Sequence, residues 1–134
     1  MKLTDIAEQV SPPELRQEIM ESISSRLAAL EASEESSILE PGGTRLLVAS
    51  DVALLDCDFE GDQTRRFKIE VIPWDAVPVP WIVYVGFLPW NDERVEASMT
   101  LHLEREFHAM YPPPNRKIAE DFYLSVLRHW RPKS

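Results

Sequence analysis

The residues with the clearest potential for chemistry are carboxylates at alternate positions of residues 56–62, which read DCDFEGD. Oxygen ligands spaced in this way before a glycine are typical of the first half of an EF-hand calcium loop. The second half of that pattern is missing, because Phe67 stands at the twelfth position, where a bidentate glutamate is required. We therefore interpret the segment as an acidic hairpin tip that offers carboxylates to arginine or lysine of a partner: Asp56, Asp58, Glu60 and Asp62.

A second group of metal-ligand types lies further along the chain at His102, Glu104, Glu106 and His108. In an extended strand the outer two would be about 20 Å apart, which is too far for one ion. In a helix they would form two pairs at i, i+4 spacing, a closer geometry for a shared metal. We interpret the group as a solvated face, and we predict no metal site and no cofactor.

Nucleophilic catalysis has little support in the sequence. The negative charges of Asp56 and Asp58 flank the single cysteine, Cys57, and oppose formation of its thiolate. The chain has no Gly-x-Ser-x-Gly elbow and no phosphate-binding glycine loop. We therefore expect a protein that is not an enzyme. One cysteine cannot form an internal disulfide, which favours a reducing, cytoplasmic location.

Three tryptophans lie in the proline-rich stretch 73–90, at positions 74, 81 and 90. The prolines keep much of this stretch extended, because each also disfavours the helical conformation of the residue before it. The tryptophans either belong to the core or anchor a protein interface. We select Trp74 and Trp90 as the candidate anchors.

The charge of the chain is unevenly distributed. Residues 1–62 contain fourteen acidic and four basic residues, a net of −10, whereas residues 63–134 contain nine acidic and ten basic residues, a net of +1. Such an acidic half repels nucleic-acid phosphate and anionic lipid and favours a basic partner. The apolar run 77–90 is broken by prolines and is too short to span a bilayer, and the amino terminus has no apolar signal-peptide core. The sequence therefore predicts no nucleic-acid partner and no membrane segment.

The hydrophobic pattern predicts one domain, residues 1–134, with a helical segment in residues 1–33. Its main helix covers residues 12–32, with leucine and isoleucine at spacings of three and four, and a short helical turn precedes it. Residues 34–43 are rich in Ser, Glu, Pro and Gly, and we interpret them as an acidic linker. A closing helix is expected over residues 115–130, after three consecutive prolines.

A period of two indicates a β-sheet over residues 44–110. Residues 45–59 form either one bent strand or two, and 66–72 and 81–88 form further strands. The stretch Trp81–Val85 has no polar alternation, so we expect a central strand covered on both faces. Residues 95–104 fit a strand without exception, and a helix is the alternative.

Together these elements predict an α+β fold: an antiparallel meander of four to five strands, with an amino-terminal and a carboxy-terminal helix on one face. The size, acidity and helix–sheet–helix order resemble type III secretion chaperones, although the middle helix of that family would coincide with Pro73–Pro80.

We expect a small acidic, bacterial protein that associates stoichiometrically with a basic protein, as an inhibitor, immunity or anti-defence protein, adaptor or dedicated chaperone. A metal- or ligand-binding protein and a structural subunit of a phage or secretion assembly are the alternatives, and a homodimer is compatible with each. The candidate contact residues are Glu34, Glu35, Glu40, Asp56, Asp58, Glu60, Asp62, Trp74 and Trp90.

Overall fold

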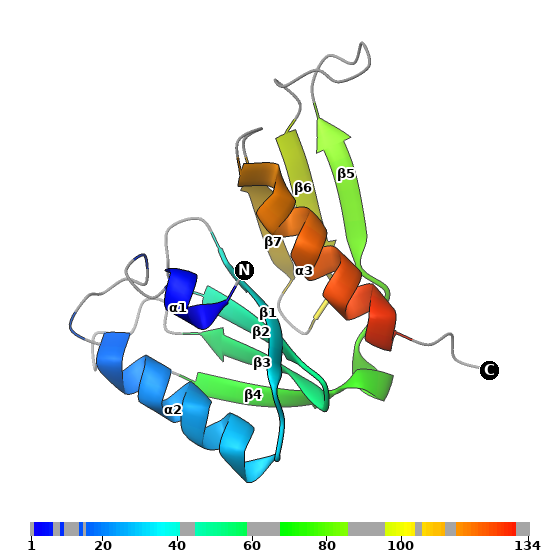
Figure 1. Cartoon of the computed structure of the whole chain (residues 1–134). Coiled ribbons are helices and arrows are strands. Elements are labelled where there is room, and N and C mark those ends of the chain that lie inside the picture. The colour runs from blue at the N-terminus through cyan, green and yellow to red at the C-terminus, as the bar shows by residue number, and fades with distance from the viewer. Residues whose placement is uncertain are drawn as a thin grey trace.

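The computed structural model has an α+β fold, as the sequence predicts, built from two antiparallel sheets and helices that pack on them (Figure 1). It describes residues 2–6, 9, 14, 16–40, 45–58, 68–85, 96–103, 106–111 and 115–130. Within these ranges no helix is both long enough and apolar enough to cross a membrane.

The first sheet is a four-stranded meander in the order β1-β2-β3-β4. Its strands are β1 (Glu34–Leu39), β2 (Arg45–Ser50), β3 (Ala53–Asp58) and β4 (Lys68–Pro73). Residues 45–58 therefore form two strands. Ser50 stabilises the turn between them, because its hydroxyl accepts hydrogen bonds from the backbone N–H groups of Val52 and Ala53 and donates to the Ala53 carbonyl.

The second sheet has three strands in the order β5-β6-β7. They are β5 (Trp81–Val85), β6 (Glu96–Leu101) and β7 (Phe107–Tyr111). The strand interpretation of residues 95–104 is confirmed over the six residues of β6. Ala97, Met99 and Leu101 are fully buried, as the period of two predicts. The meander thus continues in a second sheet, and its strands number seven within the described ranges.

Helices precede and follow the sheets. At the amino-terminal end lie α1 (Leu3–Ile6) and α2 (Arg16–Ala29), and α3 (Arg116–His129) follows β7. Between the two sheets there is a single turn of 3₁₀ helix, η3 (Trp74–Ala76). This turn ends at Val77, whose backbone is extended because Pro78 follows it and disfavours the helical conformation.

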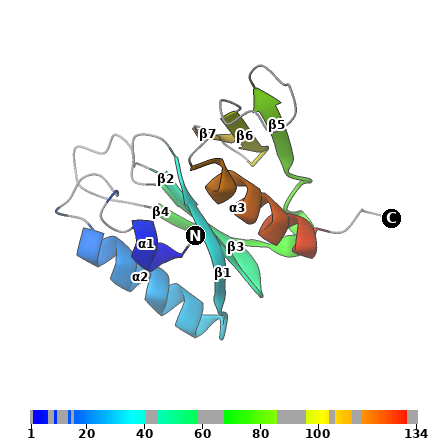
Figure 2. The same cartoon turned by 45° about the horizontal axis from the view of Figure 1, so that its top comes forward.

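The apolar residues form two cores on opposite faces of the first sheet. On β2, Leu46 and Val48 pack with Ile19 and Ile23 of α2, whereas Leu47 and Ala49 pack with α3 and the second sheet. Successive residues of a strand point to opposite faces. The expectation that both helices share one face is therefore wrong: α2 and α3 lie on opposite sides of the first sheet (Figures 1 and 2).

Two further expectations are wrong in the structure. Residues 34–39 of the predicted acidic linker form the edge strand β1, because β2 supplies backbone partners and its polar residues find hydrogen bonds within the fold. The stretch Trp81–Val85 is an edge strand and is not central, with Trp81 56% exposed and Val83 53% exposed. Prolines at positions 78 and 80 were the relevant signal, since proline next to a strand favours a sheet edge.

Candidate interaction surfaces

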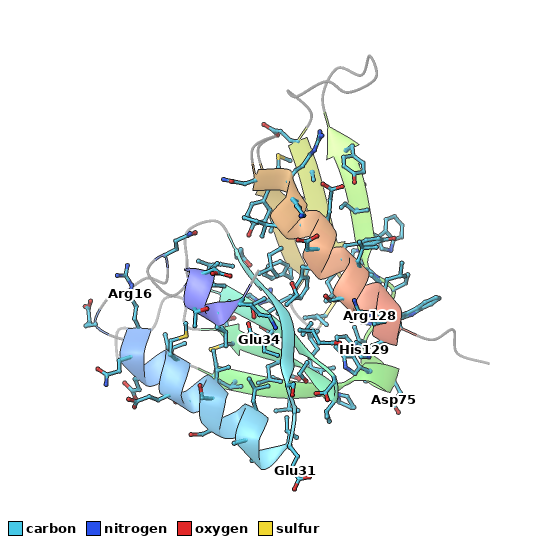
Figure 3. All side chains as sticks on the ribbon, in the orientation of Figure 1. Arg16, Glu31, Glu34, Asp75, Arg128 and His129 are labelled. Carbon is cyan, nitrogen blue, oxygen red and sulfur yellow. The ribbon has the colours of Figure 1, made fainter. Side chains whose placement is uncertain are left out.

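Glu34, a predicted contact residue, fastens the amino terminus to the first sheet (Figure 3). Its carboxylate accepts hydrogen bonds from the Leu3 backbone N–H and the Ser37 hydroxyl, both at 2.6 Å. The Lys2 ammonium donates to the Glu34 carbonyl oxygen, also at 2.6 Å. These contacts satisfy the carboxylate within the chain, so Glu34 has a structural role in the fold.

Glu35, the next predicted residue, binds the last turn of α3. The pairing register between β1 and β2 shifts between Glu34 and Ser36, which leaves Glu35 as the extra residue of a β-bulge. Bulges re-aim side chains, and here the carboxylate contacts Arg128 Nη1 at 3.0 Å and His129 Nε2. Glu35 therefore joins the edge of the first sheet to the carboxy-terminal helix.

Trp74, a predicted anchor, belongs to the same joint. Its ring stacks on the imidazole of His129 with 4.6 Å between centroids, and its indole N–H donates to the Ser50 carbonyl at 2.9 Å. The ring also packs against the core between the sheets. Trp74 is thus half-buried and packs on the core, and among the tryptophans that the structure describes the exposed one is Trp81.

Asp56, which was predicted to lie on a solvated face, is buried in an ion pair with Arg45. The Arg45 guanidinium donates to both carboxylate oxygens, at 3.0 and 2.8 Å, and its side chain is only 1% exposed. Glu40 lies 3.9 Å from the same guanidinium. The expected solvation of Asp56 is wrong because Arg45, a diagonal neighbour on β2 two residues from the direct partner Leu47, brings a matching charge into the interior.

The remaining predicted residues are less fully placed. Asp58 is half-buried and lies directly opposite Lys68 of β4 in the pairing register. Glu60, Asp62 and Trp90 lie outside the described residues. The acidic tip therefore contributes one described half-buried carboxylate, Asp58, beside the buried Asp56.

The described candidates for chemistry include a buried thiol and an exposed histidine–glutamate pair. Burial, together with the charges of Asp56 and Asp58, raises the pKa of the Cys57 thiol to about 12, so the thiolate is scarce at neutral pH. His102 and Glu106 are both exposed and lie 3.6 Å apart. Among the described residues, no three His, Cys, Asp or Glu side chains are grouped as metal ligands.

A serine–histidine contact also occurs on the second sheet. Ser98 Oγ lies 2.6 Å from His108 Nε2 on the neighbouring strand. A catalytic pair needs a third group to orient the histidine and donors for an oxyanion. No such group is described at the other ring nitrogen, so the contact is an ordinary cross-strand hydrogen bond.

Two surfaces that the sequence did not single out are present. The first is a surface hollow of about 430 Å³ between α2 and β4. It is lined by Glu18, Glu21, Ser22, Ser25, Arg26 and Ile69. Both glutamates are exposed, and their spacing of three places them on one side of the helix.

The second surface is the free edge of β5, where Trp81, Val83 and Tyr84 are about half exposed. Leu124 of α3 is also 56% exposed. It follows Glu120 by one helical turn, and Glu120 accepts a hydrogen bond from the Tyr84 hydroxyl at 2.8 Å. Leu124 therefore lies on the side of α3 that faces β5. We call these four residues, Trp81, Val83, Tyr84 and Leu124, the β5 edge patch.

Comparison of the chain with protein-family models, with curated proteins and with solved structures found no match.

Proposed function

We propose that the protein is a non-enzymatic binding module that associates stoichiometrically with a basic protein, and that the exposed carboxylates of α2 form its docking surface. By binding that partner, the protein would act as an inhibitor, an immunity or anti-defence protein, an adaptor or a dedicated chaperone. The supporting observation is the hollow of about 430 Å³ between α2 and β4, where Glu18 and Glu21 face solvent.

The excess negative charge is what makes this surface the best candidate. Glu34, Glu35 and Asp56 already contact cations or donors inside the fold, so the charge open to a partner must come from other residues. Among the described part of residues 1–62, two basic residues are exposed, Lys2 and Arg26. The exposed acidic residues there are Asp5, Glu14, Glu18, Glu21, Glu31 and Asp51.

The hollow supplies shape as well as charge. Ile69 contributes an apolar wall, while the two carboxylates outnumber the single guanidinium of Arg26. A long basic side chain has the matching form, because arginine and lysine bury their methylene stems against apolar surface and keep the charged end at a carboxylate. We therefore expect an arginine or lysine of the partner to enter the hollow.

The test begins with capture of partners by the tagged full chain from the native host, identification by mass spectrometry, and purification of the captured protein. In the double variant Glu18→Lys/Glu21→Lys, the association rate with that protein should fall by about tenfold or more at low salt, with a smaller change in dissociation. The control is Asp75→Lys, an exposed acidic residue of η3.

Three results would contradict the proposal. The captured proteins could be acidic, the association rate could be independent of salt, or Asp75→Lys could slow association as much as the α2 double variant. The last result would show that total charge matters and that α2 is not the contact surface.

A further inference from the structure

Within residues 81–85, the edge strand β5 lacks several of the features by which proteins normally prevent an edge from pairing. Residues 76–90 contain no charged side chain, and residues 81–85 contain no proline and no glycine. The pairing of β5 with β6 is regular along all five residues, without a bulge. An edge that is regular, uncharged and apolar is a template for another strand.

The edge exposes the side chains that an interface would bury. Trp81 and Val83 point to the face of the sheet away from α3, and Ile82 and Tyr84 to the face that α3 covers, because successive residues alternate. Leu124 extends this surface onto the helix. Apolar residues are therefore available on both sides of an added strand.

The distribution of charge identifies the occupant as a second copy of the chain. A basic partner gains little here, because residues 76–90 contain no carboxylate and Glu120, beside Tyr84, lies 3.9 Å from the Arg116 guanidinium. Two acidic chains, in contrast, can approach only where they do not repel. The net charge is −10 in residues 1–62 and +1 in residues 63–134. Contact through β5 keeps α1 and α2 of the two copies on the far sides of their first sheets (Figure 1).

The geometry of the strand allows a symmetric contact. In antiparallel pairing of β5 with itself, the register centred on Val83 uses the whole strand and places Ile82 of one copy opposite Tyr84 of the other. A two-fold axis perpendicular to the sheet then relates identical surfaces, as an isologous dimer requires. Both α3 helices cover the same face of the joined sheet, and Leu124 of each copy lies toward the axis.

We propose that two copies of this chain form a reversible homodimer by antiparallel pairing of their β5 strands, and that the β5 edge patch is the interface. The two three-stranded sheets become one continuous six-stranded sheet. A five-residue strand and one helical side chain bury less than the roughly 800 Å² per partner of a standard interface, so the dimer dissociates on dilution. The inference is independent of the proposed partner, whose docking surface on α2 remains free.

The first test is analytical ultracentrifugation of the full chain over a range of concentrations. We expect a shift from the 15.4 kDa of one chain to twice that mass as the concentration rises. Val83→Lys should raise the dissociation constant by about tenfold or more, because the axis brings the two lysines together. Val52→Lys is the control, since Val52 is 44% exposed in the turn between β2 and β3 and should leave the mass unchanged.

A single-chain mass at every concentration, a larger assembly, or an undiminished dimer in Val83→Lys would overturn the proposal. If circular dichroism shows that Val83→Lys does not fold, the interface is tested instead by copper-phenanthroline oxidation of the variant Val83→Cys. Directly opposed residues of antiparallel strands have Cα atoms about 4.5–5.5 Å apart, within the range of a disulfide. A covalent dimer should form from Val83→Cys and not from Val52→Cys. Absence of that dimer, or equal yields from the two variants, would also overturn it.

Discussion

Arg45 holds the two sheets together through one side chain. Its guanidinium bonds both oxygens of Asp56 within the first sheet, and its Nη1 donates to the Glu106 carbonyl at 3.0 Å, directly before β7. The same group lies 5.4 Å from the centroid of the Phe107 ring. A charge this deeply buried is tolerated because each of the three guanidinium nitrogens donates a hydrogen bond.

Removal of one member of this pair should be more damaging than removal of both. Asp56→Ala leaves a buried guanidinium without its carboxylate and should lower the free energy of unfolding by about 3–5 kcal/mol. Arg45→Met/Asp56→Leu, which fills similar volume without charge, should recover most of that loss. Urea unfolding of the three proteins measures the difference. An equally large loss in the double variant would show that the contacts of Arg45 to β7 matter more than charge balance.

Cys57 should make the fold sensitive to alkali. Its pKa is raised in the folded state from 9.0 to about 12, mainly by burial and further by Asp56 and Asp58. The folded chain therefore keeps a proton that the unfolded chain releases above pH 9. The contribution of this pKa shift to the free energy of unfolding is fully present below pH 9. Between pH 9 and 12 it falls by about 1.4 kcal/mol per pH unit.

Tyr111 adds to the same loss, because burial raises its pKa from 10.0 to about 12. Urea unfolding from pH 8 to 11 in the wild type and in Cys57→Ala measures the contribution of the thiol. We expect a shallower decline in the variant. Parallel declines would mean that other groups control alkaline unfolding.

At the scale of elements, the sequence predicts the helices and strands whose apolar residues follow a regular period. The buried face of β6 and the isoleucines of α2 follow simple periodicity, and both are confirmed. β1 could not be predicted, because Glu34 and Glu35 become compatible with a strand only through Leu3 and Arg128, which are distant in sequence. Likewise, the apolar side chains of β5 fit a central strand as well as an edge strand, and only the preceding prolines at positions 78 and 80 indicate an edge.

The end of α2 has a local defect that a single substitution can relieve. The N–H of Ala32 bonds the Leu27 carbonyl and the N–H of Glu31 bonds the Ala28 carbonyl, which is a Schellman motif. Glu31 occupies the position where glycine is preferred, with φ of 52°. A side chain with a Cβ in this left-handed region costs about 1 kcal/mol.

Glu31→Gly should therefore stabilise the protein by about 0.5–1 kcal/mol, even though glycine usually destabilises. Thermal unfolding monitored by circular dichroism gives the change in midpoint. Glu31→Ala is the matched control, since it removes the charge but keeps the Cβ. If alanine stabilises as much as glycine, the benefit comes from lost charge repulsion and not from backbone strain.

At the scale of the whole molecule, the candidate surfaces depended on packing that the sequence does not show. The sequence shows the charge asymmetry, but it does not show which carboxylates form ion pairs or hydrogen bonds within the fold. Glu34, Glu35 and Asp56 each met an internal partner, while Glu18 and Glu21 remained at the surface. The distinction arises because long-range contacts decide which charges are neutralised.

This division of charges makes a prediction about salt. Exposed carboxylates on α2, such as Glu18 and Glu21, repel one another at close helical spacing, whereas partly exposed ion pairs such as Arg128–Glu35 attract. Salt screens both, but an exposed pair contributes only about 0–1 kcal/mol, and the chain carries a net charge of −9. Repulsion should therefore dominate, and the melting temperature should rise when sodium chloride shortens the Debye length from about 30 Å to about 3 Å.

Calorimetry at fixed protein concentration measures this rise without interference from association. Glu18→Gln/Glu21→Gln should melt higher than the wild type at low salt and should gain less from added salt, because part of the repulsion is already gone. Asp75→Asn, which removes one exposed charge from η3, serves as the control and should change the salt dependence less. A melting temperature that falls with salt would mean that ion pairs such as Arg128–Glu35 outweigh the repulsion. The acidic surface of α2 would then be balanced within the folded chain, and its claim to attract a basic partner would lose its electrostatic basis.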